Sequence, residues 1–243
     1  MYFIDTHIHL QDYKSINATD IIAKAKILNI KKLICVSAEE KDWPNVTQFF
    51  NAYPDVVVPA FGIHPWYVNN TLPDWQDRLC SLLRQYPCSL VGECGIDGYK
   101  PFMEQQIETF KFQSDLAKKL HRPLIVHAVK SQSFFEKSWH LLPEKFVIHS
   151  YNGNLEFLKQ IIKHNGYIGL SASILKNKNI KELLSNIPHN KLLLETDGPY
   201  QSLHQGSEAY TWFIIEQLQR LEQITGYPMA EQIYQNSLEF IKC

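Results

Sequence analysis

Histidine and carboxylate residues recur in this sequence directly after short apolar runs, and side chains of these types can bind a metal ion. His7 and His9 lie two residues apart at the end of the first run, so the period of two in a strand places both side chains on one face. The pair can therefore bind one cation together. The candidates at the ends of later runs are Glu93, His127, His149 and Asp197.

The chemistry of this ligand set indicates a site for divalent cations. Imidazole suits Zn²⁺, Mn²⁺, Fe²⁺ or Ni²⁺, and a carboxylate can bridge two cations and also accept a proton from a water molecule. Two cations about 3.5–4 Å apart can stabilise both the attacking and the leaving oxygen of a displacement reaction. Mg²⁺ alone accounts poorly for so many histidines.

Each candidate also has a structural explanation when it is taken singly. A lone His-x-His pair on a strand is often a hydrogen-bonded pair, and one histidine after an apolar run is often structural. A buried Glu93 without a partner, however, is costly in a low-dielectric interior, and a cation compensates for that cost. Six such residues at the same end of five predicted strands favour the metal site over six separate structural roles.

Short apolar runs alternate along the chain with segments of helical spacing, which predicts βαβ units and a parallel sheet. Met103, Ile107 and Phe110 have the spacing of an amphipathic helix, as do Trp212 and Ile215. Helix-starting residues stand at Thr19-Asp20 and at Asp74. The predicted strands are 3–7, 33–37, 56–62, 90–95, 124–127, 146–149, 167–170 and 192–196.

Eight such units in 243 residues predict an α/β fold with one domain, a single (β/α)₈ TIM barrel over residues 1–243. The alternative is a doubly wound open sheet, but that fold normally has a glycine-rich fingerprint after its first strand. Here the first strand ends in His7-Ile8-His9. In a barrel, the C-terminal ends of the strands converge on one mouth, where the candidate ligands would meet.

The composition excludes several other classes of protein. Lysine and arginine total 24 and aspartate and glutamate total 25, so a formal charge of −1 gives no global field to hold a polyanion. No apolar run is long enough to span a bilayer. The sequence has no Cys-x-x-Cys motif, so a zinc-thiolate site is not favoured. The first residues lack a basic n-region and a cleavage site, so we expect a cytoplasmic protein with no membrane contact.

The order and spacing of six motifs resemble the TatD family of metal-dependent deoxyribonucleases, and the resemblance covers essentially the whole chain. Gln106 and Asn236 also match the family pattern. The motifs are Asp5-Thr6-His7-Ile8-His9-Leu10, Gly62-Ile63-His64-Pro65, Gly92-Glu93-Cys94-Gly95-Ile96-Asp97, Pro123-Leu124-Ile125-Val126-His127, His149-Ser150-Tyr151-Asn152-Gly153 and Leu194-Glu195-Thr196-Asp197-Gly198-Pro199.

The resemblance implies a barrel of the amidohydrolase superfamily with two divalent ions, for which we consider Mg²⁺, Mn²⁺ or Zn²⁺. Asp197 would orient or deprotonate the attacking water, and His64 would face a phosphate or the leaving group. One ion would be held by His7, His9, Glu93 and Asp197, and the second by Glu93, His127 and His149. Carboxylates beside metal ligands often orient imidazoles, and we expect this role of Asp5, Asp97 and Glu195.

The sequence departs from the family pattern where the substrate would bind. The family commonly has an arginine at the position of Val129, and Lys130 next to it can replace the charge but not the bidentate fork. The loop after Pro199 is also shorter than the family's usual loop. Trp66 and Tyr151 are candidate platforms on which a base could stack.

We therefore expect a metal-dependent hydrolase acting on ester bonds, a TatD-like deoxyribonuclease that shortens single-stranded DNA from an end by means of a metal-activated water. No obligate protein partner is evident. One alternative is an amidohydrolase-type enzyme acting on a small amide, lactone or aminoacyl ester, which the neutral charge and the missing arginine keep open. A non-catalytic binding barrel is disfavoured because all six candidate ligands are present.

Overall fold

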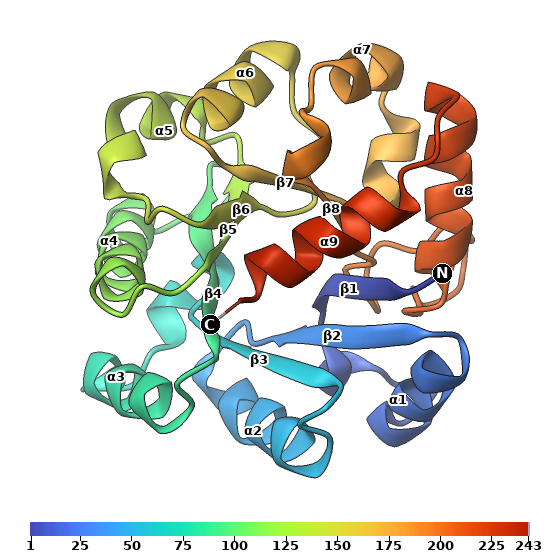
Figure 1. The fold of residues 1–243 in the computed structure, drawn as a ribbon. Helices are drawn as coiled ribbons and strands as arrows, with labels where there is room; N and C mark the ends of the chain where they lie inside the picture. The colour runs from blue at the N-terminus through green and yellow to red at the C-terminus, as the bar shows by residue number, and fades with distance from the viewer. Residues whose placement is uncertain (243) are drawn as a thin grey trace.

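A computed structural model describes residues 1–242, and its eight parallel strands form one sheet in the order β1 to β8 (Figure 1). The strands surround the centre of the molecule and the helices lie outside them, as a (β/α)₈ barrel requires. This confirms the predicted fold. The strands are β1 Phe3–Ile8, β2 Ile30–Val36, β3 Val57–Phe61, β4 Leu90–Asp97, β5 Leu124–Val129, β6 Phe146–Ile148, β7 Tyr167–Leu170 and β8 Leu192–Leu194.

The barrel closes between β1 and the segment that follows β8. Ile8 forms a parallel bridge with Gly198. The Asp197 amide donates to the His7 carbonyl (2.9 Å), and the His9 amide donates to the Gly198 carbonyl (2.8 Å). These contacts place the first and last predicted ligands of the chain side by side.

The helices mostly cover the outside of the sheet (Figure 1). The helical spacings predicted α4 and α8 correctly, and Asp74 does precede α3. The start of α1 was predicted about two residues late, because Asn17 rather than Thr19-Asp20 caps the helix and accepts from the Asp20 amide. The helices are α1 Ala18–Ile27, α2 Trp43–Ala52, α3 Trp75–Gln85, α4 Met103–Lys119, α5 Gln132–Ser138, α6 Leu155–Lys163, α7 Ile180–Ser185, α8 Phe213–Thr225 and α9 Ala230–Phe240.

One helix, α9, lies across an open end of the barrel instead of beside the sheet (Figure 1). Its Phe240 is fully buried and packs in the barrel interior with residues such as Val36, Ile125 and Leu193. The chain therefore fills this end of the barrel with apolar side chains. The opposite end, where the strands finish, is left for chemistry.

Several strand boundaries differ from the predicted ones by one to three residues. β2 begins at Ile30, three residues earlier than expected, and β8 ends at Leu194, two residues earlier. After β8 the Thr196 amide and hydroxyl both donate to the Asp5 carboxylate, which diverts the chain from strand pairing. Within residues 1–242, no helix has the length and apolar character needed to cross a membrane.

Candidate metal centre

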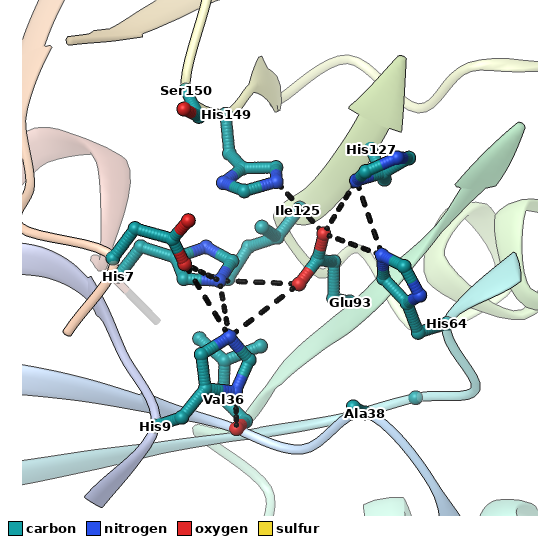
Figure 2. Close-up of polar contacts among 12 residues, drawn as sticks. His7, His9, Val36, Ala38, His64, Glu93, Ile125, His127, His149 and Ser150 are labelled. Atoms are coloured by element: carbon teal, nitrogen blue, oxygen red, sulfur yellow. Dashed lines mark hydrogen bonds and ion pairs between the residues drawn. The ribbon is translucent and has the colours of Figure 1, made fainter. Parts of the chain in front are cut away.

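The six predicted ligands and His64 meet at the C-terminal mouth of the barrel, with the Glu93 carboxylate at their centre (Figure 2). All seven residues are at least nine-tenths buried. The nitrogens nearest Glu93 are His149 Nε2 (2.8 Å), His127 Nδ1 (3.1 Å), His7 Nε2 (3.2 Å), His64 Nε2 (3.3 Å) and His9 Nε2 (3.7 Å). One carboxylate therefore contacts five imidazoles from four different parts of the chain.

Asp197 completes the side of the cluster formed by β1. Its Oδ1 lies 3.5 Å from His9 Nε2 and 3.6 Å from His7 Nε2. Asp197, three residues after β8, has a left-handed backbone (φ 54°), a conformation that aspartate tolerates better than most residues. The segment after the last strand thus supplies an oxygen to the two histidines at the end of the first strand.

The donor atoms fit a divalent cation better than they fit one another. His7 Nε2 and His9 Nε2 face each other at 3.1 Å, with carboxylate oxygens of Glu93 and Asp197 beside both. A cation between these atoms would bind the nitrogen lone pairs and neutralise the buried carboxylates. The ligand atoms within 4.8 Å of one another form three groups, which are His7, Glu93 and His149; His7, His9 and Asp197; and His64, Glu93 and His127.

Three of the histidines have a neighbour on the ring nitrogen that faces away from the cluster, which is a hydrogen bond for His9 and His127 and an ion-pair contact for His149. Such partners fix the ring so that its other nitrogen can bind a metal. The predictions for Asp97 and Glu195 are consistent with this arrangement. The partners are the Val36 carbonyl for His9 (2.9 Å), Asp97 for His127 (3.2 Å) and Glu195 for His149 (3.4 Å).

Asp5 does not orient an imidazole, contrary to expectation. Its carboxylate accepts instead from the backbone and hydroxyl of Thr196 (2.9 and 2.6 Å), and burial raises its pKa to about 7. Asp5 therefore ties β1 to the segment after β8. Its role is to hold the two ligand-bearing segments together.

His64 differs from the other histidines in its hydrogen bonding. Its Nδ1 accepts from the Trp66 amide (3.1 Å), so the neutral ring carries its proton on Nε2, the atom that faces Glu93 and His127. Burial lowers the pKa of His64 to about 4, which keeps the ring neutral. A nitrogen that carries a proton cannot ligate a cation, so His64 is suited to donate a hydrogen bond into the site.

The electrostatics of the cluster favour charged ligands in the metal-free protein. Burial opposes ionisation of Glu93, but His149, His64 and His7 hold its pKa well below the usual range. Burial likewise opposes a charge on His9, but the contact with Asp197 raises the pKa of His9 to about 9. Glu93 also raises the pKa of His149 against the effect of burial. Metal-free protein at neutral pH thus holds protons where a cation would bind.

We predict from these pKa shifts that metal binding releases protons at pH 7. Because the raised pKa values keep His9 and His149 protonated, a cation must displace those protons, and its affinity rises with pH by about tenfold per unit for each proton displaced. Titration calorimetry with Mn²⁺ in two buffers of different ionisation heat measures the number of protons released. Heats that are independent of the buffer would contradict this prediction.

The mouth opens into a cleft of about 930 Å³ that has Glu93 and Asp197 at its base. Lys130 is exposed on its wall, with Nζ 5.8 Å from the centre of the Tyr99 ring. Trp66 is half-exposed, and its indole N–H donates to Asp97 (2.6 Å), the carboxylate that also contacts His127. Trp66 is therefore held rigidly beside the cluster, in a position where a base could stack.

Tyr151 was predicted as a second stacking platform, and the structure does not support that role. Its side chain is buried in the core beside Phe157, and its hydroxyl donates to the Asn154 carbonyl. Tyr151 lies in the wall of the cleft, but with only 3% of the residue exposed it offers a base little surface on which to stack. The strand-end position of Tyr151 misled the sequence prediction because it resembles that of an exposed rim residue.

Sequence reasoning missed Gln201, which donates to Asp197 Oδ2 (2.6 Å). Gln201 lies in the loop after β8, outside every strand and motif that drew attention to the other residues. Its proximity to Asp197, four residues earlier, was the one available signal. An uncharged side chain at that spacing has no specific chemical signature in a sequence.

The family model described as TatD related DNase matches residues 4–242. The chain is 24% identical to the Uncharacterized metal-dependent hydrolase YabD of Bacillus subtilis, over 96% of each protein. It is 27% identical to the 3'-5' ssDNA/RNA exonuclease TatD of Edwardsiella piscicida, over 74% of this chain and 72% of that protein. Among solved structures, YjjV, a TatD homolog from Escherichia coli, superposes with a TM-score of 0.87 at 23% identity, over 98% of this chain and 97% of that one.

Proposed function

The chain belongs to the family of TatD related DNases, and we propose that it is a two-cation nuclease that removes nucleotides from the ends of single-stranded DNA. The observation that carries this proposal is the position of Glu93, whose buried carboxylate contacts imidazoles on both sides. A carboxylate so placed can be shared between two cations. The small-molecule amidohydrolase alternative is not favoured, because relatives of this chain are named as nucleases and the family is described by DNase activity.

Four histidines and two carboxylates would hold the cations. The ligand set suits Mn²⁺ or Zn²⁺, and Mg²⁺ remains a candidate because two ligands are carboxylates. Bound divalent cations supply Lewis acidity, which stabilises negative charge on phosphate oxygens and favours the ionisation of water. We assign His7, His9 and Asp197 to the side of Glu93 Oε2, and His127 and His149 to the side of Oε1, the oxygen that both of these imidazoles contact.

Asp197 and His64 have the geometry for proton transfer and hydrogen bonding. Asp197 Oδ1 faces the cluster, and the His9 contact keeps the pKa of this carboxylate low despite burial, so it is ionised and can accept a proton from the attacking water. The Nε2 proton of His64 points into the same space and can donate to an oxygen of the phosphate. His64 remains neutral, so we assign it hydrogen-bond donation rather than acid catalysis.

The size of the cleft and its sparse positive charge support the end of a single strand as the substrate. Lys130 is the one lysine or arginine among the described residues that line it, and the net charge of the whole chain is −1. A long polyanion would gain little from this surface. One nucleotide, with its phosphate at the cations and its base against Trp66, would use the contacts that the cleft offers.

We predict that Trp66→Ala raises the KM for a single-stranded oligonucleotide by about 5- to 100-fold, since stacking on an aromatic ring contributes about 1–3 kcal/mol per base. Trp66→Phe keeps an aromatic face but loses the bond to Asp97, so its KM should lie between those of the wild type and Trp66→Ala. Steady-state kinetics test both variants. Tyr2→Ala, which removes a half-exposed aromatic outside the cleft, is the control, and equal KM values for all variants would rule out stacking on Trp66.

Hydrolysis of an end-labelled single-stranded DNA tests the proposed function. Metal-free protein is resupplied with Mg²⁺, Mn²⁺ or Zn²⁺ and is compared on the same day with a panel of amides, lactones and aminoacyl esters. Stepwise shortening of the DNA that requires a cation would support the proposal and give the direction of digestion. Turnover of a panel compound without DNA cleavage would refute it.

A further inference from the structure

Gln201 connects the metal centre to a small network of hydroxyl groups. Its side-chain nitrogen Nε2 donates to Asp197 Oδ2 and to Ser150 Oγ, each at 2.6 Å. Its side-chain oxygen accepts from Ser171 Oγ at 2.7 Å. Both donor hydrogens and the acceptor of this amide therefore have partners.

The orientation of the Gln201 amide follows from its neighbours. The Gln201 nitrogen lies 2.6 Å from Asp197 Oδ2, a carboxylate oxygen, and donates to it. The amide oxygen then faces Ser171, whose hydroxyl must donate to it. Ser171 uses its proton in that bond, so it accepts from Ser150 Oγ (2.7 Å), which in turn accepts from Gln201.

These bonds form a closed ring in which each group donates to the next. The ring links the segments that follow three neighbouring strands, because Ser150 follows β6, Ser171 follows β7 and Gln201 follows β8. Ser150 is also the next residue after His149, beside the cluster (Figure 2). Ser171 is fully buried, so the ring is anchored in the protein interior.

We propose that Gln201 is a positioning residue of the metal centre, which holds Asp197 through its bond to Oδ2 so that Oδ1 faces His7 and His9. The two oxygens of Asp197 thereby have separate tasks, since Oδ1 lies 3.5 and 3.6 Å from these imidazoles while Oδ2 binds the amide. Without the bond to Gln201, the carboxylate could rotate and lose its alignment. The catalytic consequence rests on the proposed nuclease function, but the effect on metal binding does not.

The first test measures Mn²⁺ binding to metal-free protein. Gln201→Leu removes the donors and the acceptor at similar side-chain size, and should weaken Mn²⁺ binding by about 10- to 100-fold, the usual cost of losing a group that orients a ligand. Gln205→Leu makes the same change at an exposed site of the same loop and should bind Mn²⁺ like the wild type. Equal Mn²⁺ affinity of Gln201→Leu and the wild type would overturn the proposal.

The second test uses Ser171→Ala, which leaves Gln201 and every proposed ligand in place. Ser171→Ala should weaken Mn²⁺ binding less than Gln201→Leu does, and the double variant should bind about as weakly as Gln201→Leu alone, because both changes break one ring. If the double variant instead weakens Mn²⁺ binding by the product of the two single-variant effects, the linkage through the ring is overturned. Thermal unfolding of each metal-free variant identifies any that has failed to fold. If Gln201→Leu has failed to fold, the Mn²⁺ affinity of Ser171→Ala relative to the wild type decides the test.

Kinetics separate positioning from a purely structural role. At saturating Mn²⁺, Gln201→Leu should lower kcat by about 10- to 100-fold with KM for DNA nearly unchanged, because the substrate does not contact Gln201 in this account. Gln201→Asn keeps the amide on a shorter side chain and should recover part of the loss. An unchanged kcat would overturn the proposal, whereas absence of DNA cleavage by the wild type would refute the proposed function and leave the Mn²⁺ measurements as the test of Gln201.

Discussion

Glu93→Gln is expected to abolish hydrolysis, with a loss of more than about 10³-fold in kcat, and to remove most of the bound metal. Glu93 contacts all five imidazoles of the cluster, and among residues 1–242 no other carboxylate does so. The amide of glutamine has one oxygen and no charge, so it cannot replace an anion shared by two cations. Metal content per chain and the rate of hydrolysis are measured on the same preparation.

Glu104→Gln is the matched control for this prediction. Glu104 is an exposed carboxylate at the start of α4, away from the cleft, and its loss should leave metal content and rate unchanged. If Glu93→Gln retained both bound metal and a rate within tenfold of the wild type, Glu93 would not be the central ligand.

Asp197→Asn is expected to lower kcat by about 10²- to 10⁴-fold while the protein keeps most of its metal. The two side chains have the same shape, but an amide cannot accept a proton from water. The new amide can turn only its oxygen toward the cations, which leaves its NH₂ group facing the NH₂ group of Gln201, so a modest loss of metal affinity is also expected. Equilibrium metal binding and kcat at saturating metal separate the two effects, and normal turnover would remove Asp197 from the role of general base.

The sequence carried most of the information about the fold. The hydrophobic runs of a buried parallel sheet are nearly continuous, and each was followed by a helical segment, so eight strands could be located. The ends of the strands were harder to predict from the sequence, because side-chain contacts between distant residues determine them. The Thr196 bonds to Asp5 end β8 early, and nothing in the local pattern of residues 192–196 reveals a partner 191 positions away.

The cluster of ligands was predictable because strand ends of a barrel must converge, so residue type and position together located it. The finer details depend on atoms that no pattern specifies. His64 was recognised, but its proton position follows from a bond to the Trp66 amide. The burial of Tyr151 depends on the neighbouring Phe157, and Gln201 was missed because its role depends on a loop.

Anomalous diffraction from crystals of the protein grown with Mn²⁺ tests the central claim most directly. We predict two peaks about 3.5–4 Å apart, one on each side of the Glu93 carboxylate, with His9 and Asp197 beside one peak and His127 beside the other. A single peak would contradict the two-cation site. No peak at the cluster at saturating Mn²⁺ would contradict the metal centre itself.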